Sequence, residues 1–252
     1  MKKEKKQKKP LMFRFIKWLI GVFFRKKKLI GLENLGDEPC IVVGNHAQAF
    51  GPLFGELHFP TPVKIWCVDK MLNKKEASAY AYEDFWSGKP KSTRWFFKLL
   101  SPLLGRILYF AMSNAECIPV YRDMRALNTY KLTVQALEQE KNVLIFPEGR
   151  EKYNDIVNKF QERYVEVAKI YCKRTGKALS FVPMYYAVSL KTVVFGKPIQ
   201  FSLDKSVEEQ MSEISKYLME EITKMAKELP RHKVVPYENL SKRQYKWSKE
   251  KE

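Results

Sequence analysis

The 252-residue sequence predicts an α/β fold with a mixed, largely parallel central sheet flanked by helices. Short apolar runs alternate with longer segments in which apolar residues recur every three or four positions. Three of the short runs stop at, or within two residues of, a polar side chain, namely His46, Arg122 and Glu148. Because open α/β sheets build their sites beyond the carboxyl ends of their strands, these residues predict a site at that edge.

The individual elements follow from local composition and periodicity. Apolar and β-branched segments predict strands at 40–43, 63–68, 117–121, 142–146, 180–187 and 192–200. Helical spacing predicts helices at 51–57, 71–85, 124–140, 159–174 and 206–225. Ser206 and Glu209 are expected to form a capping box at the start of the last helix. The order strand, helix, strand over 117–146 predicts a βαβ unit with parallel pairing of its strands.

Basic residues are concentrated at the N-terminus. The net charge is +18, and residues 1–28 hold twelve Lys or Arg against one Glu. Within them, residues 11–24 are largely Leu, Ile, Phe and Trp, interrupted by Arg14 and Lys17. A spanning helix needs ~20 apolar residues, so this run predicts an interfacial membrane helix. An ordinary helix packed on the core is the alternative, and an anionic membrane surface is the expected partner.

Three regions are expected along the chain. Residues 1–28 form a basic amphipathic anchoring segment, residues 29–230 one α/β domain, and residues 231–252 a basic tail. A second apolar stretch at 95–112 contains Pro102, which is expected to kink or end a helix there. We expect a bent, shallowly embedded segment, a lid over an acyl chain, or a buried core helix.

Cofactor and metal motifs are missing from the sequence. The four cysteines are widely spaced with no C-x-x-C pair, which favours free thiols in a reducing cytosol. No phosphate-loop, G-x-S-x-G or metal-ligand spacing occurs, so no metal and no cofactor are expected. No nucleic-acid motif accompanies the basic residues, which lie beside Phe and Trp, so a nucleic-acid partner is disfavoured.

Four motifs occur in a fixed order along residues 40–200. They are N-H at Asn45–His46, I-P-V-Y-R ending at Arg122, F-P-E-G-R over 146–150, and V-P at 182–183. This order resembles the glycerolphosphate and lysophosphatidic acid acyltransferase family. The resemblance implies that His46 is the general base, and an imidazole, whose ordinary pKa is ~6.5, suits proton transfer near neutral pH.

The resemblance also implies the substrate-binding residues. Glu148 and Gly149 are expected to bind the glycerol part of the acceptor, with Arg122 and Arg150 on its phosphate. Lys70 matches a recurrent lysine position of the family loosely.

One position departs from the family pattern N-H-x4-D. Gly51 replaces the aspartate that would orient His46. Loss of such an acid lowers the rate ~10⁴-fold in the serine-protease template. The sequence leaves the orienting group unknown, because several carboxylates could approach His46 in space: Asp69, Glu83, Asp84 and Glu148.

The resemblance therefore implies a membrane-associated acyltransferase, placed peripherally or monotopically on the cytoplasmic face. It would move a fatty acyl chain from acyl carrier protein or coenzyme A to a glycerolphosphate- or lysophospholipid-type hydroxyl. The alternative is a catalytically weakened or inactive acyltransferase-fold protein that binds lipid or acts as a scaffold.

Overall fold

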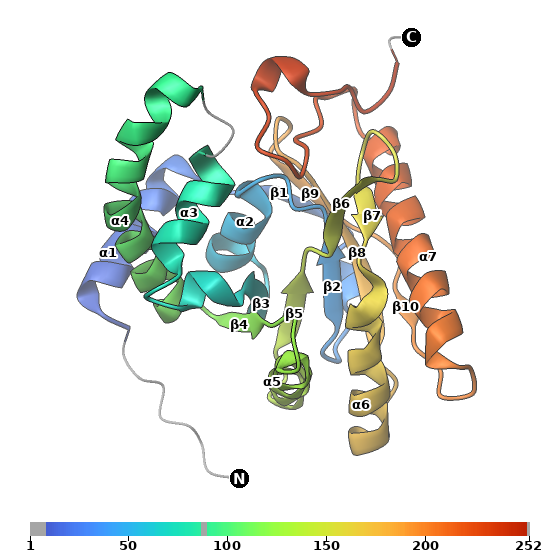
Figure 1. Cartoon of the computed structure of the whole chain (residues 1–252). Helices are drawn as coiled ribbons and strands as arrows, with labels where there is room; N and C mark the ends of the chain where they lie inside the picture. Colours follow the sequence, from blue (N-terminus) through green and yellow to red (C-terminus); the bar gives the residue numbers. More distant parts are fainter. Residues whose placement is uncertain (1–8, 87–89, 251–252) are drawn as a thin grey trace. The chain divides into compact units, whose positions relative to one another are not determined.

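The structure is a computed structural model that describes residues 9–86 and 90–250, except the side chains of residues 84 and 85. The chain divides into two compact units (Figure 1). The first comprises 1–25 and 68–117, and the second comprises 26–67 and 118–252.

The sheet of the second unit has the mixed, mostly parallel pairing that the sequence predicts. Its strand order is β1-β9-β8-β2-β5-β3-β4, with β10 pairing β8. β2 pairs in parallel with both β5 and β8, whereas β8 pairs antiparallel with β9 and β10. The strands are β1 Lys28–Ile30, β2 Ile41–Gly44, β3 Val63–Val68, β4 Cys117–Val120, β5 Asn142–Ile145, β8 Ser180–Ala187, β9 Thr192–Phe195 and β10 Ile199–Gln200.

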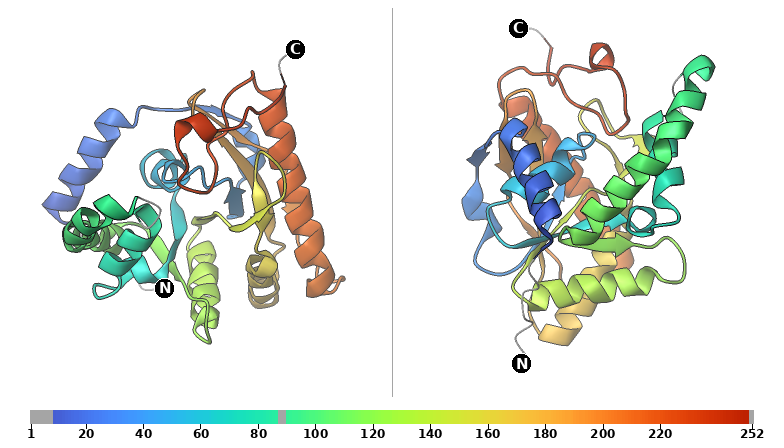
Figure 2. Two further views of the ribbon diagram at one scale, coloured as in Figure 1. Left: turned by 45° about the horizontal axis from the view of Figure 1, so that its top comes forward. Right: turned by 90° about the vertical axis from the view of Figure 1, so that its left-hand side faces the viewer.

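Helices cover both faces of this sheet (Figure 2). Alternate residues Ile41 and Val43 of β2 point into one core with α5, α6 and α7. The opposite face packs on α2, where the Phe54 and Tyr186 rings lie 5.8 Å apart. The helices are α2 Phe50–His58, α5 Ala126–Glu138, α6 Glu166–Thr175 and α7 Val207–Glu228, with 3-10 turns η1 Leu32–Leu35, η3 Glu162–Val165 and η4 Lys242–Gln244.

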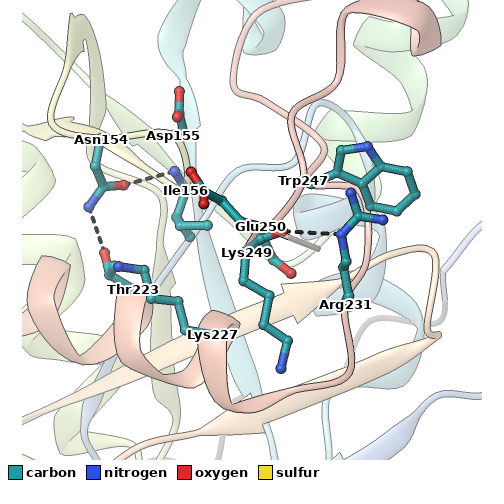
Figure 3. Close-up of a pocket in the computed structure, with 10 residues that line it drawn as sticks. Asn154, Asp155, Ile156, Thr223, Lys227, Arg231, Trp247, Lys249 and Glu250 are labelled. Atoms are coloured by element: carbon teal, nitrogen blue, oxygen red, sulfur yellow. Dashed lines mark hydrogen bonds between the residues drawn. The ribbon is translucent and has the colours of Figure 1, made fainter. Parts of the chain in front are cut away.

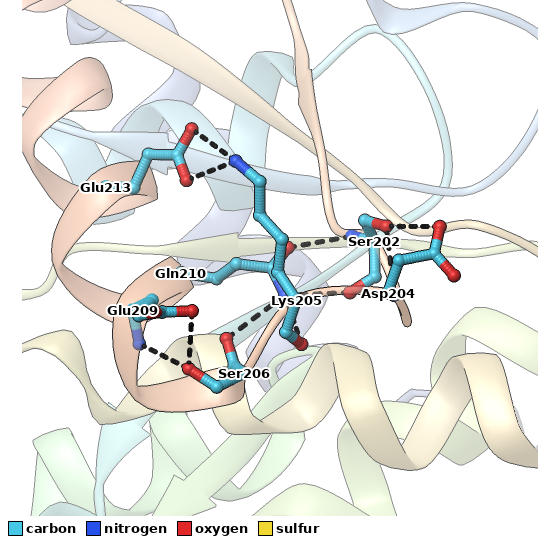
Figure 4. Close-up of polar contacts among 7 residues, drawn as sticks. All are labelled: Ser202, Asp204, Lys205, Ser206, Glu209, Gln210 and Glu213. Atoms are coloured by element: carbon cyan, nitrogen blue, oxygen red, sulfur yellow. Dashed lines mark hydrogen bonds and ion pairs between the residues drawn. The ribbon is translucent and has the colours of Figure 1, made fainter.

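The start of α7 has the Ser206 side-chain cap of the predicted capping box, whereas the Glu209 carboxylate binds the Ser206 hydroxyl and not its backbone N–H (Figure 4). The Ser206 hydroxyl accepts the Glu209 N–H at 3.2 Å and donates to the Glu209 carboxylate at 2.8 Å. The buried Gln210 side chain also binds the Ser202 backbone, accepting its N–H and donating to its carbonyl. These bonds satisfy otherwise unpaired groups at the helix start.

Several predicted elements are wrong in detail. β3 lies between β4 and β5, so the two strands of the 117–146 unit do not pair with each other. Residues 148–152 form strand β6 (Glu148–Lys152), which the sequence did not predict, and it pairs with β7 (Asn158–Phe160), which overlaps the start of the predicted helix 159–174. The short, polar β6 has none of the apolar alternation by which strands are recognised.

The first unit contains α1 Leu11–Phe23, η2 Asp69–Leu72, α3 Ala77–Trp86 and α4 Lys91–Asn114. α3 and α4 approach closely at Gly105, where an added Cβ would lie 2.3 Å from the Ser78 hydroxyl. Where the sequence predicted one helix at 71–85, the structure has η2 followed by the shorter helix α3. Only α4, among the described residues, is long and apolar enough to cross a membrane by length and composition.

Helix α4 continues through Pro102, so this proline does not end it. Proline cannot donate the N–H that the Lys98 carbonyl would otherwise accept. The Ser101 hydroxyl donates to that carbonyl at 2.9 Å and takes the place of the missing donor. Ser101 and Gly105 are the buried residues of α4, so the helix is not a buried core helix.

Candidate active site

His46 and Glu148 meet because their strands are parallel neighbours in register. Val43 of β2 pairs with Ile145 of β5, and each site residue follows three positions later. The His46 N–H donates to the Glu148 carboxylate at 2.6 Å. The predicted location beyond the carboxyl ends of the strands is therefore confirmed for these two residues.

Asn45 fixes the start of the loop that carries His46. Its side chain is 2% exposed and pairs with the backbone of Tyr186 on β8. The amide oxygen accepts the Tyr186 N–H at 2.7 Å, and the amide nitrogen donates to the Tyr186 carbonyl at 3.4 Å. The side chain thus continues the sheet pairing where the main chain of β2 turns away.

Glu148 is a buried carboxyl group shared by two loops. Its second oxygen accepts the Asn158 N–H at 2.8 Å, so it joins the His46 loop to β7. Burial raises the pKa of Glu148 to about 7. The two amide donors act in the opposite direction, and the nearby Glu238 carboxylate raises the pKa further.

The His46 ring is oriented by a backbone carbonyl. Nδ1 lies in hydrogen-bonding contact with the Gln48 carbonyl oxygen, which can only accept, so Nδ1 carries the proton. Nε2 then bears the lone pair. The ring also packs edge-on against Phe146 and Tyr237, with centroids 5.3 and 5.5 Å away. Burial lowers the pKa of His46, which favours the neutral imidazole.

Among the described residues, no carboxylate hydrogen-bonds the His46 ring. Glu148 contacts the backbone N–H of His46. Asp69 and Glu83 belong to the first unit, and the side chain of Asp84 lies outside the described residues.

The position of the family aspartate has no room for a side chain. A Cβ on Gly51 would lie 2.7 Å from both the His46 carbonyl oxygen and the Phe146 ring. The Gly51 N–H donates to that carbonyl at 3.1 Å. Glycine is therefore required by the packing of this loop, in addition to being a departure from the family pattern.

The other predicted site residues are less closely gathered. Gly149 follows Glu148 on β6, and its carbonyl accepts from the Asn158 side chain at 2.9 Å. Arg150, on the same strand, and Arg122, after β4, have exposed side chains. Lys70 lies in η2 of the first unit. Their roles toward phosphate stay predictions.

Residues 230–249 form a segment that we call the C-terminal strap. The sequence did not predict its contacts with the site. The Gln48 amide nitrogen donates to the Glu238 carbonyl at 3.0 Å and to the Leu240 carbonyl at 3.3 Å. Glu238 also accepts from the Asn158 side chain at 3.2 Å. No motif marks these contacts, because they join residues 80 to 192 positions apart.

A separate cavity of about 690 Å³ lies beside the end of α7 (Figure 3). It is lined by ten residues, among them Lys227, Arg231 and Trp247, and by none of the predicted site residues. The Arg231 guanidinium stacks on the Trp247 ring at 3.8 Å, which leaves this charge engaged within the strap.

Comparison with known families agrees with the sequence motifs. A family model described as Acyltransferase matches residues 91–187. The matched segment includes Arg122, Glu148, Gly149 and Arg150 and begins after His46. The acyltransferase resemblance is thereby confirmed over these residues.

Curated proteins and solved structures give different results. No curated protein matches the chain. Among solved structures, the chain is similar to the 1-acyl-sn-glycerophosphate (LPA) acyltransferase PlsC from Thermotoga maritima, with 15% identity and a TM-score of 0.45. The alignment covers 82% of this chain and 78% of that one.

Proposed function

We propose that this protein is a membrane-associated acyltransferase that transfers a fatty acyl chain from a thioester to a glycerolphosphate- or lysophospholipid-type hydroxyl. The observation that carries the proposal is the His46 ring, whose Nδ1 faces the Gln48 carbonyl. That contact leaves Nε2 as a base, and burial lowers the His46 pKa so that the ring is neutral at pH 7.

The proposed chemistry needs one base and no covalent enzyme intermediate. Nε2 of His46 accepts the proton of the acceptor hydroxyl while the hydroxyl oxygen attacks the thioester carbonyl. The carbon–sulfur bond then breaks, and the imidazolium returns the proton to the departing thiolate. The products are the ester and the free thiol of acyl carrier protein or coenzyme A. No metal or cofactor takes part in these steps.

Membrane association is supported by exposed apolar faces on α1 and α4 of the first unit. On α1, the exposed apolar side chains fall within an arc of about 140° at 100° per residue. They include Phe15, Trp18 and Phe23, which are 56%, 62% and 81% exposed. Arg14 and Lys17 lie outside this arc, as expected of a helix in the headgroup region of an anionic, cytoplasmic-face membrane.

Helix α4 presents a similar stripe. Trp95, Leu99, Leu103 and Ile107 recur every four residues, and each is exposed. Such contiguous exposed apolar surface is uncommon on a soluble monomer and typical of a lipid contact.

A lipid-binding or scaffold protein without catalysis is the second candidate. Gly51 in place of the family aspartate favours it, since no carboxylate in the described structure hydrogen-bonds the His46 ring. The two candidates differ in whether lipid binding is accompanied by transfer.

Purified full-length protein on anionic vesicles distinguishes them. We expect ester formation when labelled acyl-coenzyme A or acyl-acyl carrier protein is supplied with a panel of lysophospholipid and glycerolphosphate acceptors. His46→Ala should abolish transfer, and His58→Ala is the matched control that should retain it. Binding of acceptor without transfer in the wild type would instead establish the scaffold.

A further inference from the structure

The loop that orients His46 adopts an unfavourable backbone conformation. Ala47 and Gln48 have φ angles of 47° and 55°, in the left-handed region that residues with a Cβ rarely occupy. Two successive residues in this region turn the chain back on itself, which brings the Gln48 carbonyl to Nδ1 of His46. Such a conformation persists only where surrounding contacts hold it.

The C-terminal strap supplies those contacts through the Gln48 side chain. The Gln48 amide nitrogen donates to the Glu238 and Leu240 carbonyls, and the Tyr245 hydroxyl donates to the Gln48 amide oxygen at 3.3 Å. Within the described residues, all hydrogen bonds of this side chain are therefore made to the strap. Tyr237 of the strap packs edge-on against the His46 ring.

The strap is itself anchored to the sheet. Lys233 and Trp247 form an antiparallel bridge that closes it into a loop. At its base, His232 is 2% exposed and hydrogen-bonds the Tyr185 hydroxyl of β8 at 2.8 Å. The Gln48 contacts are consequently made to a segment that is fixed on the same core as His46.

We propose that Gln48 and the C-terminal strap are the positioning group of His46, in the role that an aspartate fills elsewhere in the family. The Gln48 carbonyl holds the proton on Nδ1, and Tyr245 and the Glu238 and Leu240 carbonyls hold Gln48. The inference rests on the proposed function insofar as His46 is the base, but the positioning itself concerns only the tautomer of the ring.

A carbonyl and a carboxylate orient the ring equally but differ in charge. Either one accepts from Nδ1–H and leaves Nε2 free of a proton. The carbonyl has no net charge with which to stabilise the imidazolium, so the site keeps the tautomer control of the aspartate without its electrostatic contribution. The consequence is a base whose orientation depends on the strap.

The test uses Gln48→Ala and Tyr245→Phe in the full-length protein. Gln48→Ala keeps the backbone carbonyl and removes its anchor, and Tyr245→Phe removes one hydroxyl. Gln139→Ala and Tyr153→Phe are matched controls at exposed positions away from the loop. Circular dichroism and thermal unfolding establish that each variant is folded.

The decisive readout is the ¹⁵N spectrum of the histidine rings above pH 8, with the His46 signals assigned by their loss in His46→Ala. We expect the Nδ1–H form in the wild type and both controls, and a growing Nε2–H fraction in Gln48→Ala and Tyr245→Phe. We also expect kcat to fall about 10- to 100-fold in Gln48→Ala, within the ~10⁴ limit of a mis-set tautomer, with KM changed less than about twofold.

Each result bears on a different statement. An unchanged Nδ1–H spectrum in folded Gln48→Ala would overturn the positioning role. A shifted spectrum together with no acyl transfer in the wild type would support the positioning role and refute the proposed function.

Discussion

At the scale of a single residue, Glu148 joins the His46 loop to β7, and its carboxyl group makes the stability of the protein depend on pH. The folded-state pKa of about 7 lies above the ordinary value of 4.5, because burial disfavours the charged form. The folded protein therefore binds this proton more tightly than the unfolded chain does. Its contribution to stability is full below pH 4.5 and is lost as the pH rises through 7, on the order of 3 kcal/mol.

Glu148→Gln should remove this dependence. The amide can accept only one of the two backbone N–H groups, so we expect a loss of roughly 1–3 kcal/mol at pH 5. The free energy of unfolding should then fall less between pH 5 and 8 than in the wild type. Urea unfolding across this range measures both effects, with the exposed Glu151→Gln as control. An identical slope in Glu148→Gln would exclude Glu148 as its source.

Gly51 is the second residue whose packing leads to a prediction. A side chain there would press on the His46 carbonyl and the Phe146 ring, so restoring the family aspartate should disturb the loop. We expect Gly51→Ala to lower stability by roughly 1–3 kcal/mol through overpacking, and Gly51→Asp by more, since it also buries a carboxylate.

Thermal unfolding compares these variants with Gly21→Ala, at a helical glycine where an added Cβ would meet no atom within 4 Å beyond its own helix backbone and chain neighbours. The control should unfold at or above the wild-type temperature. Transfer activity should not rise in Gly51→Asp. A stable and faster Gly51→Asp would show that the loop has room for the aspartate after all.

At the scale of elements, helix α4 illustrates what local sequence reasoning can miss. Pro102 predicted a break, yet the neighbouring Ser101 hydroxyl takes over the missing donor and the helix continues. The hairpin of β6 and β7 was missed because its strands are short and polar, so they lack the pattern by which a strand is predicted. Its contacts with the rest of the fold, such as the bond from the His46 N–H to Glu148, join residues far apart in the sequence, so periodicity does not reveal them.

The apolar stripes of α1 and α4 give a prediction at the same scale. Trp18→Asp and Leu99→Asp each place a charge on an exposed apolar face, so we expect binding to anionic vesicles to weaken at least tenfold, from ~1.5–3 kcal/mol per lost apolar side chain. Vesicle co-sedimentation measures this.

Leu127→Asp is the matched control, because Leu127 is 70% exposed on α5 of the second unit. By helical spacing Leu127 shares a face with Tyr130, Val134 and Leu137, yet only the latter three are buried. Equal vesicle binding by Leu99→Asp and wild type would refute a lipid contact at α4.

At the scale of the whole molecule, the sequence predicted the site residues that the parallel register of neighbouring strands brings together. It did not predict the contacts that the C-terminal strap makes with them. His46 and Glu148 were predicted at one sheet edge because each directly follows an apolar strand. The central strands 63–68 and 180–187 were predicted with their observed bounds from composition alone. The strap could not be predicted, because its contacts with Gln48 are hydrogen bonds between an ordinary glutamine and backbone carbonyls.

The strap also determines when the site becomes complete during protein synthesis. His46 leaves the ribosome nearly two hundred residues before Glu238 and Leu240, which hold its neighbour Gln48. The sheet can form once β8 and β9 have been translated, whereas the orientation of His46 must await Glu238, Leu240 and Tyr245. A nascent chain that stops before these residues would thus contain a folded core with an unaligned base, and transfer would begin only after they have been translated.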